Sequence, residues 1–336
     1  MIHLSPTSRQ PVREAWTLER LNAELTINLG MAIDRSTHGN YTSAANSYIT
    51  FCRLHGFDIE PTPRTLALYV TFQSAYINPK SVDTYLSGIA NQLESHFPEV
   101  RSSRKSVLVA RALQGAKRRF GVPTHRKLPL TKADLLHVLG AYGPTPNHDD
   151  LLFLTQLFTG TNCLMRLGEL TWPDALALQD YRKVSMRPSV ERLPEAFSFW
   201  LPGHKADQFF EGNRLLIQKS SSETYRLFES YLTSRDQLFR SRPELWLRAD
   251  GSIPTRSWFI SRLRHFFPKS IAGQSMRAGG ATALAERGTA PTLIQAAGRW
   301  SSDTFNRYVR KNPFLLEALL SSHAPHPSAF VTQGPS

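Results

Sequence analysis

The sequence predicts a mainly α-helical chain of two domains, the second of which carries a small antiparallel β-sheet. Its 336 residues are enough for about two domains of ~150 residues each. Apolar residues recur at helical spacing in both halves, and only the stretch 196–219 shows the short apolar runs of a β-hairpin. A hydrophobic fraction of 41% is ample for packed cores, so a disordered chain is not expected.

The first half of the chain predicts helices only. Apolar residues at helical spacing indicate helices over about 14–30 and 41–55, from Pro63, from Pro79, and over about 103–119. Gly56 is a suitable C-terminal stop for the second helix, and proline suits the first turn of the third and fourth. We expect the apolar stripe of each helix to face a core, including Leu18, Leu21 and Leu25 of the first.

The second half alternates between helices and strands. Thr131 and Asp134 form a capping-box-like helix start. The pattern then predicts an apolar helix over about 148–161, strands over 196–202 and 213–219, and helices again from about 255. The connection between the two strands contains Lys205. This region is therefore predicted to be a hairpin inside a mostly helical domain.

The charge of the chain favours a polyanionic partner. The net charge is +13 and the isoelectric point is about 10.0. Nucleic acid is a better candidate than a membrane, because no long apolar span or amphipathic anchor accompanies the charge. The N-terminus lacks an apolar signal core, so we expect a soluble intracellular chain. Cys52 and Cys163 have no metal-ligand spacing and are expected to be small core residues, with no metal.

One segment concentrates the positive charge. Residues 101–127 contain nine lysines and arginines and no aspartate or glutamate: Arg101, Arg104, Lys105, Arg111, Lys117, Arg118, Arg119, Arg126 and Lys127. A solvated helix face usually mixes charges of both signs. A segment of one sign favours contacts with DNA phosphates over the alternative, an exposed basic hinge. Its end, 121–131, has two prolines and no helical period, which indicates an interdomain linker.

The ending of the chain suggests phosphate chemistry. Arg277 lies among small residues at the start of a predicted helix, and Tyr308 follows among several further cations. Tyrosine has an ordinary pKa near ~10 and is a poor nucleophile. Nearby fixed cations favour its phenolate form and the negative charge at a phosphorus centre. The ending is therefore a candidate for DNA strand cleavage.

Four motifs resemble those of the tyrosine recombinases, also called the lambda-integrase type. They are TGTNCLMRLGEL (159–170), GHKADQFFEG (203–212), QSMRAGGATALAERG (274–288) and AGRWSSDTFNRYVR (297–310). The resemblance covers about residues 12–322 and is closest in style to fungal and Crypton-like members. It implies a C-shaped clamp around DNA. Its parts are a helical, SAM-like core-binding domain over 12–120, a basic linker over 121–131, a catalytic domain over 132–322 and a disordered tail over 323–336.

The resemblance implies a role for each motif. Tyr308 is the nucleophile that forms a 3′-phosphotyrosyl link and releases a 5′-hydroxyl. Arg166 and Arg277 bind the nonbridging oxygens, and Lys205 protonates the leaving oxygen. Glu169 lies one helical turn from Arg166 and orients its guanidinium. Rejoining reverses cleavage, so the resemblance implies neither a nucleotide cofactor nor a metal.

Two positions depart from the family pattern. Gln274 stands where the family has histidine; glutamine can bond a phosphate oxygen but cannot accept a proton as a base. Nine residues before the tyrosine the family has histidine or tryptophan, and here the residue is Arg299, with Trp300 beside it. Two readings stay open: Arg299 contacts the phosphate, or Trp300 packs beneath the site.

Two alternative functions stay open: the departures favour the first, and the second uses a very similar set of catalytic groups. One is a domesticated DNA-binding protein of the same fold with impaired chemistry, and the other is a type IB topoisomerase. The expected partner in each case is double-stranded DNA, and a recombinase is also expected to self-associate on DNA as a dimer or tetramer. The apolar segment 313–322 predicts a last helix that docks either on a neighbouring protomer or on its own domain. A basic cluster at 117–119 suggests a nuclear location if the source is eukaryotic.

Overall fold

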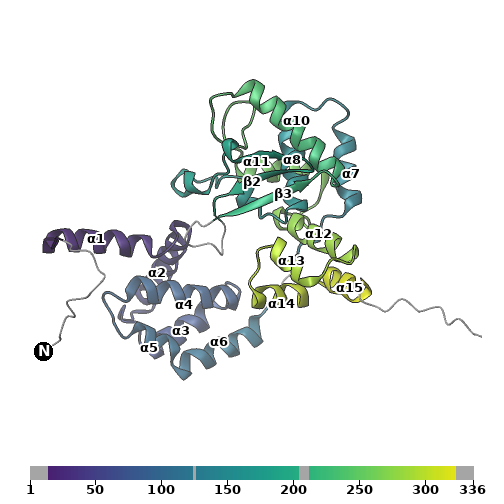
Figure 1. Cartoon of the computed structure of the whole chain (residues 1–336). Coiled ribbons are helices and arrows are strands. Elements are labelled where there is room, and N and C mark those ends of the chain that lie inside the picture. The colour runs from purple at the N-terminus through teal and green to yellow at the C-terminus, as the bar shows by residue number, and fades with distance from the viewer. Residues whose placement is uncertain (1–13, 124–125, 204–211, 323–336) are drawn as a thin grey trace, which may run out of the picture. The chain divides into compact units, whose positions relative to one another are not determined.

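A computed structural model describes residues 14–123, 126–203 and 212–322 of the chain. It divides into two compact units, Met1–Thr124 and His125–Ser336 (Figure 1). Within the described ranges, no helix has both the length and the apolar character that crossing a membrane requires. Lys205, residues 124–125 of the predicted linker and the predicted tail 323–336 lie outside these ranges.

The described part of the first unit is entirely helical. Its helices are α1 (Leu18–Met31), α2 (Arg35–His55), α3 (Pro63–Gln73), α4 (Pro79–Leu93), α5 (Val100–Lys105) and α6 (Val107–Phe120). Gly56 ends α2 with a φ of 67°, and Pro63 and Pro79 open their helices, all as predicted. The core joins α2, α3, α4 and α6 and includes Tyr48, Cys52 and Tyr69.

Two predictions for this unit were wrong. The first helix forms, with Thr17 as its N-cap, but it buries none of its residues, so Leu18, Leu21 and Leu25 are not core. Apolar periodicity predicts that a helix forms, but it does not specify which surface the helix packs against. The helix predicted over 103–119 is two helices, α5 and α6. Ser106 separates them, because its extended backbone ends α5 while its side chain accepts from Val109 N at the start of α6.

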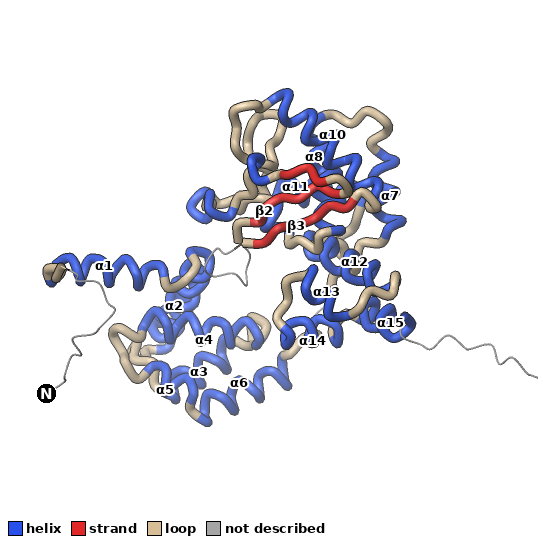
Figure 2. The backbone as a smooth tube through the Cα atoms, in the orientation of Figure 1, coloured by secondary structure: helices blue, strands red, loops and turns tan. Residues whose placement is uncertain are grey.

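The second unit combines a small sheet with several helices (Figure 2). Its helices are α7 (Lys132–Ala141), α8 (His148–Asn162), α9 (Leu167–Leu170), α10 (Ser222–Leu238), α11 (Arg256–Phe266), α12 (Gly273–Glu286), α13 (Pro291–Ala297), α14 (Ser302–Arg310) and α15 (Pro313–Ser322). The antiparallel sheet has the order β1 (Glu191–Leu193), β2 (Ala196–Leu201) and β3 (Asn213–Gln218). Three short 3₁₀ turns, Leu176–Leu178, Tyr181–Lys183 and Arg187–Ser189, precede it.

The predicted helix start at Thr131 and the two strands of the predicted hairpin are confirmed. Thr131 N donates to Asp134 Oδ2 at 2.8 Å, and Asp134 N donates to Thr131 Oγ1 at 3.1 Å, so both halves of the capping box form. Strands β2 and β3 pair from Ala196↔Gln218 to Leu201↔Asn213. No element is predicted from sequence for α10 or β1. The strand β1 is three residues long and exposed, and therefore leaves no hydrophobic pattern.

Apart from a minor cluster of Val184, Leu247 and Ile253, two clusters form the core of the second unit. The larger joins α8 and α10 to the inner face of the sheet, where Phe197 and Tyr225 lie with ring centroids 4.7 Å apart. The smaller joins α12, α13, α14 and α15, which gather together in light green and yellow in Figure 1. Leu315 and Ala318 of α15 are buried in this smaller cluster, so α15 packs on α12 of its own chain.

Small residues let α12 approach its neighbours closely. A Cβ at Gly280 would lie 2.0 Å from the carbonyl oxygen of Thr161 on α8, and one at Gly279 would lie 1.9 Å from that of Leu130. The backbone at Leu130 lies against the first turn of α12, because Leu130 N donates to Ser275 O at 3.1 Å. This close packing places α12 directly against the end of α8.

We expect Gly280→Ala to lower the free energy of unfolding of the second unit by at least about 1–3 kcal/mol, because the added methyl group meets backbone rather than a movable side chain. Chemical denaturation followed by tryptophan fluorescence measures the change. Gly140→Ala is the matched control, since no atom lies within 4 Å of its Cβ position. Equal stabilities for the two variants would contradict the packing argument.

Candidate active site

The end of α8 brings Arg166 and Glu169 together. Arg166 precedes the four-residue helix α9, and its backbone N donates to Glu169 Oε2 at 3.0 Å. Its Nη1 donates to Glu169 Oε1 at 2.9 Å. The Glu169 side chain is 5% exposed and that of Arg166 is 30% exposed. Glu169 therefore fixes one side of the Arg166 guanidinium and leaves part of it open to solvent.

Arg277 is buried in the middle of the site. Its Nη1 donates to the carbonyl oxygen of Leu164 at 2.7 Å, and its Nη2 donates to that of Gly298. Its guanidinium carbon lies 4.1 Å from the centre of the Trp300 ring, a cation–π contact. Burial, together with the charges of Arg166 and Arg299, lowers the pKa of Arg277 to about 9. The site thus holds an excess of positive charge that an anion would relieve.

Tyr308 of α14 also lies against Trp300. The two ring centroids are 4.8 Å apart. The Tyr308 hydroxyl is buried and makes no hydrogen bond that meets normal geometry with another described residue. Burial raises the pKa of Tyr308, although the nearby Asn312 amide and the charges of Arg277 and Arg126 oppose this. The nearby cations do favour the phenolate, as expected, but desolvation of the phenol outweighs them and the pKa is raised.

Arg299 and Trp300 occupy different surroundings. Trp300 is 8% exposed and contacts both Arg277 and Tyr308, and its packing beneath a bound phosphate stays a prediction. The Arg299 side chain is 6% exposed, and its Nη2 donates to Glu169 Oε2 at 2.9 Å. A single carboxylate therefore receives hydrogen bonds from both Arg166 and Arg299.

The remaining predicted residues of the site differ in how they are placed. Gln274 is exposed on the first turn of α12, three positions before Arg277. Arg126 is exposed, belongs to the second unit and lies near enough to Tyr308 to influence its pKa. The role of Lys205 stays a prediction, because that residue lies outside the described ranges.

Three groups of the site were missed from the sequence. The carbonyl oxygens of Leu164 and Gly298 hold Arg277, and backbone acceptors leave no side-chain signal. Asn312 is buried near Tyr308 and accepts from Leu315 N at 3.3 Å, at the start of α15. An asparagine before the proline that opens a helix is a recognisable cap, and this signal was available.

The basic residues of 101–119 are not all free. Most are exposed, but Arg101 is paired with Glu94, and Asp83 of α4 lies 2.8 Å from Lys117 Nζ and 3.8 Å from Arg104 Nη2. The segment itself contains no acidic residue, but this did not mean that its cations are unpaired. Their carboxylate partners are Asp83 in α4 and Glu94 directly after α4. Lys127 Nζ donates to the carbonyl oxygen of Lys269 at 2.6 Å.

We expect Asp83→Asn to tighten DNA binding several-fold and to steepen its salt dependence, because the change frees Lys117 and Arg104 for phosphate contacts. Titration of a labelled duplex at several salt concentrations measures both. Glu99→Gln removes the same charge from a carboxylate that bonds Ser102, so it is the matched control. Equal effects of the two variants would show that only net charge matters.

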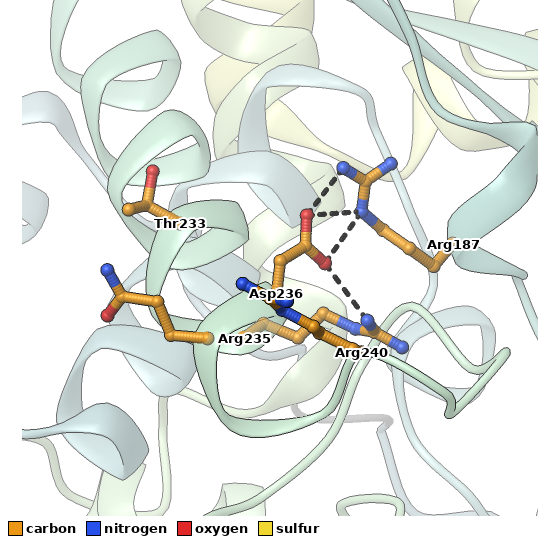
Figure 3. A pocket seen from close by; sticks show the side chains of 6 residues that line it. Arg187, Thr233, Arg235, Asp236 and Arg240 are labelled. Atoms are coloured by element: carbon orange, nitrogen blue, oxygen red, sulfur yellow. Dashed lines mark hydrogen bonds and ion pairs between the residues drawn. The ribbon is translucent and has the colours of Figure 1, made fainter.

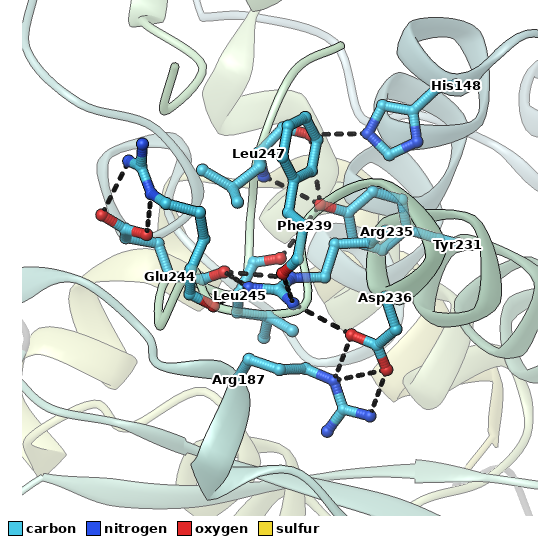
Figure 4. Close-up of polar contacts among 10 residues, drawn as sticks. His148, Arg187, Tyr231, Arg235, Asp236, Phe239, Glu244, Leu245 and Leu247 are labelled. Atoms are coloured by element: carbon cyan, nitrogen blue, oxygen red, sulfur yellow. Dashed lines mark hydrogen bonds and ion pairs between the residues drawn. The ribbon is translucent and has the colours of Figure 1, made fainter. Parts of the chain in front are cut away.

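A cavity of about 490 Å³ lies at the end of α10, and none of its lining residues belongs to the site above (Figure 3). Arg187 and the buried Arg235 both donate to Asp236 there. Burial would raise the pKa of Asp236, but these two hydrogen-bonded guanidinium groups hold it below its usual range. Arg235 also donates to the carbonyl oxygens of Phe239 and Glu244 (Figure 4). The cluster therefore secures the loop after α10.

The fold is that of the tyrosine recombinases and integrases. The solved lambda integrase dimer (residues 75–356) bound to a COC′ core site has a TM-score of 0.54 at 12% identity, covering 88% of this chain and 95% of that chain. The XerH site-specific recombinase bound to a palindromic difH substrate, in a post-cleavage complex, has a TM-score of 0.52 at 15% identity, covering 77% of this chain and 72% of that chain. No protein-family model and no curated protein matches the sequence.

Proposed function

We propose that the chain breaks and rejoins double-stranded DNA, with Tyr308 as the nucleophile. The observation that carries the proposal is the convergence of Arg166, Arg277 and Tyr308 from separate elements around Glu169, Leu164 and Trp300. A buried guanidinium and a tyrosine that both contact one indole ring, in a site with excess positive charge, suit attack on a phosphodiester.

The proposed step is a transesterification. The Tyr308 oxygen bonds to phosphorus, the 5′ oxygen of the leaving strand departs, and a 3′-phosphotyrosyl ester forms. Arg166 and Arg277 stabilise the negative charge on the nonbridging oxygens. The phenolic proton passes to water or to a phosphate oxygen, since Gln274 cannot accept it, and Lys205 supplies the proton that yields the 5′-hydroxyl. Attack by a 5′-hydroxyl reverses the step.

The partners and setting of this reaction are part of the proposal. The first unit, with its exposed basic residues on α5 and α6, is proposed as the core-binding domain on DNA. Self-association as a dimer or tetramer on DNA is supported by the lambda integrase structure, which is a dimer on its core site. An integration reaction, an origin in a mobile element of the Crypton style and a nuclear location stay predictions.

A second candidate is a DNA-binding protein with impaired chemistry. The exposed Gln274 and the raised pKa of Tyr308 favour it, because both slow ionisation of the nucleophile. Loss of one acid–base group costs on the order of 10²–10⁴ in rate. Slow cleavage is therefore expected even where the first proposal holds.

The two candidates are separated by trapping a covalent complex. The probe is a pool of nicked duplexes with randomised sequence around the nick, from which the short cleaved fragment escapes and prevents rejoining. The first proposal predicts an SDS-resistant protein–DNA adduct. Binding without an adduct would favour the impaired protein, and relaxation of a supercoiled plasmid without recombinant products would favour a topoisomerase.

A further inference from the structure

Arg299 adopts an unusual backbone conformation for its type. It lies between α13 and α14 with a φ of 53°, in the left-handed region. In the described part of the chain, Leu164, with a φ of 49°, is the other non-glycine residue with positive φ. This conformation costs roughly 1–2 kcal/mol for a residue with a Cβ. Both residues lie in the candidate site, where strained backbone is commonly retained for function.

The hydrogen bonds of Arg299 all point into the protein. Its Nη1 donates to the carbonyl oxygens of Cys163 and Ala297, at 3.3 and 3.4 Å. Its Nη2 donates to Leu164 O at 3.3 Å and to Glu169 Oε2 at 2.9 Å. These four bonds account for the four Nη hydrogens, and the Nε–H is buried and has no hydrogen-bond partner among the described residues. In the free protein, no donor of this side chain therefore faces solvent, from which a phosphate would approach.

The acceptors of Arg299 are those that hold the other two arginines. Glu169 also accepts from Arg166, and the Leu164 carbonyl also accepts from Arg277. We propose that Arg299 is a positioning residue that sets Arg166 and Arg277 relative to each other through Glu169 and Leu164, and that it does not bind the phosphate. This inference rests on the proposed function and assigns Arg299 a task within the same site.

The chemistry of arginine suits this task. Arg299 makes four hydrogen bonds at once, which exceeds the two donors of histidine and the three of lysine but not the five of a guanidinium. Cys163 and Leu164 follow α8 and Glu169 lies in α9, whereas Ala297 ends α13 and Arg299 follows it. Arg299 thus fastens the segment that carries Trp300 to the segment that carries Arg166.

The first test uses variants that keep the backbone conformation. In Arg299→Asn the new residue tolerates positive φ, but the guanidinium is removed. Arg299→Lys keeps the positive charge but replaces the planar, forked set of donors with a single ammonium group. We expect Arg299→Asn to reduce the single-turnover cleavage rate at saturating DNA about 10²-fold, as misplacement of catalytic groups does, with little change in DNA affinity. In the double variant, Arg299→Asn should lower the cleavage rate little beyond the loss caused by Arg166→Ala, because both arginines act through the same Glu169 carboxylate. Multiplicative losses together with weaker binding would instead identify a phosphate ligand.

The second readout is the protonation of Arg277, which faces Arg166, Arg299, Glu169 and Tyr308. A group with pKa near 9 is charged below that pH, so cleavage at subsaturating DNA, which reports the free protein, should fall as pH rises through about 9. Removing the charge of Arg299 should raise the pKa of Arg277 and move this fall to higher pH in Arg299→Asn, but less in Arg299→Lys. A variant that only loosens the fold would lower the rate without this shift.

The pKa of Arg277 can also be compared between the parent and the variants without measuring cleavage. Carbon-13 NMR of the Arg277 guanidinium in the labelled full chain follows its titration directly, with Arg277→Lys used to assign the signal. The inference predicts a higher pKa in Arg299→Asn than in the parent. An unchanged titration would overturn the inference about Arg299, whereas absence of a DNA adduct in the parent would overturn only the proposed cleavage.

Discussion

A Tyr308→Phe variant is expected to bind DNA as tightly as the parent and to form no covalent adduct. The change removes one oxygen, and that oxygen is the proposed nucleophile. The Tyr308 hydroxyl is buried without a well-formed hydrogen bond to another described residue, so its removal strands no partner. The free energy of unfolding should therefore stay the same or rise by about 1 kcal/mol. Gel analysis in SDS and thermal denaturation measure the two effects.

A second tyrosine of the same unit provides the control for the Tyr308→Phe variant. Tyr142 is a partly buried tyrosine of the same unit, next to α7 and away from the proposed site, so Tyr142→Phe should keep the adduct. An adduct with Tyr308→Phe that equals that of the parent would exclude Tyr308 as the nucleophile. A fall in stability of several kcal/mol would show instead that the hydroxyl has a structural partner.

Arg277→Ala should lower the rate of strand cleavage about 10²–10³-fold, the typical loss for one preorganised donor to a developing negative charge. The effect on stability should be smaller than for most buried arginines. The lost bonds to Leu164 O and Gly298 O are offset in part, because the change removes one of three cations that share a single carboxylate. Single-turnover cleavage of a nicked duplex under saturating protein measures the rate.

Arg310→Ala is the control for Arg277→Ala. Arg310 is exposed at the end of α14, close to Tyr308 in sequence but outside the hydrogen-bonded cluster. Its loss should weaken DNA binding modestly and leave the rate at saturation unchanged. Equal rate losses in both variants would mean that general positive charge, and not the placement of Arg277, supports cleavage.

The elements of the fold were more predictable than their contacts. Helix starts and stops carry local chemistry, so Gly56, Pro63 and the pair Thr131 and Asp134 could be placed from sequence. The first helix shows the limit. Its leucines have the spacing of a buried stripe, yet they remain exposed, because periodicity does not specify a tertiary partner.

The sequence predicted which residues form the candidate site, but not the pKa values of these residues. Motif spacing pointed to Arg166, Glu169, Arg277 and Tyr308, and the structure brings them together. The raised pKa of Tyr308 depends on how deeply the ring is buried, which spacing does not encode. The contacts of Arg299 depend on two left-handed residues that are far apart in the chain, and no local pattern reveals such a pairing.

The most direct measurement of the central claim is to locate the bond between protein and DNA. The trapped adduct is digested with protease and nuclease, and mass spectrometry identifies the residue that carries the nucleotide, while end-labelling identifies the released DNA end. We predict a nucleotide joined through its 3′ phosphate to Tyr308 and a free 5′-hydroxyl on the released strand. A link to another residue, a 5′-phosphotyrosyl bond, or tight DNA binding without any adduct would contradict the account.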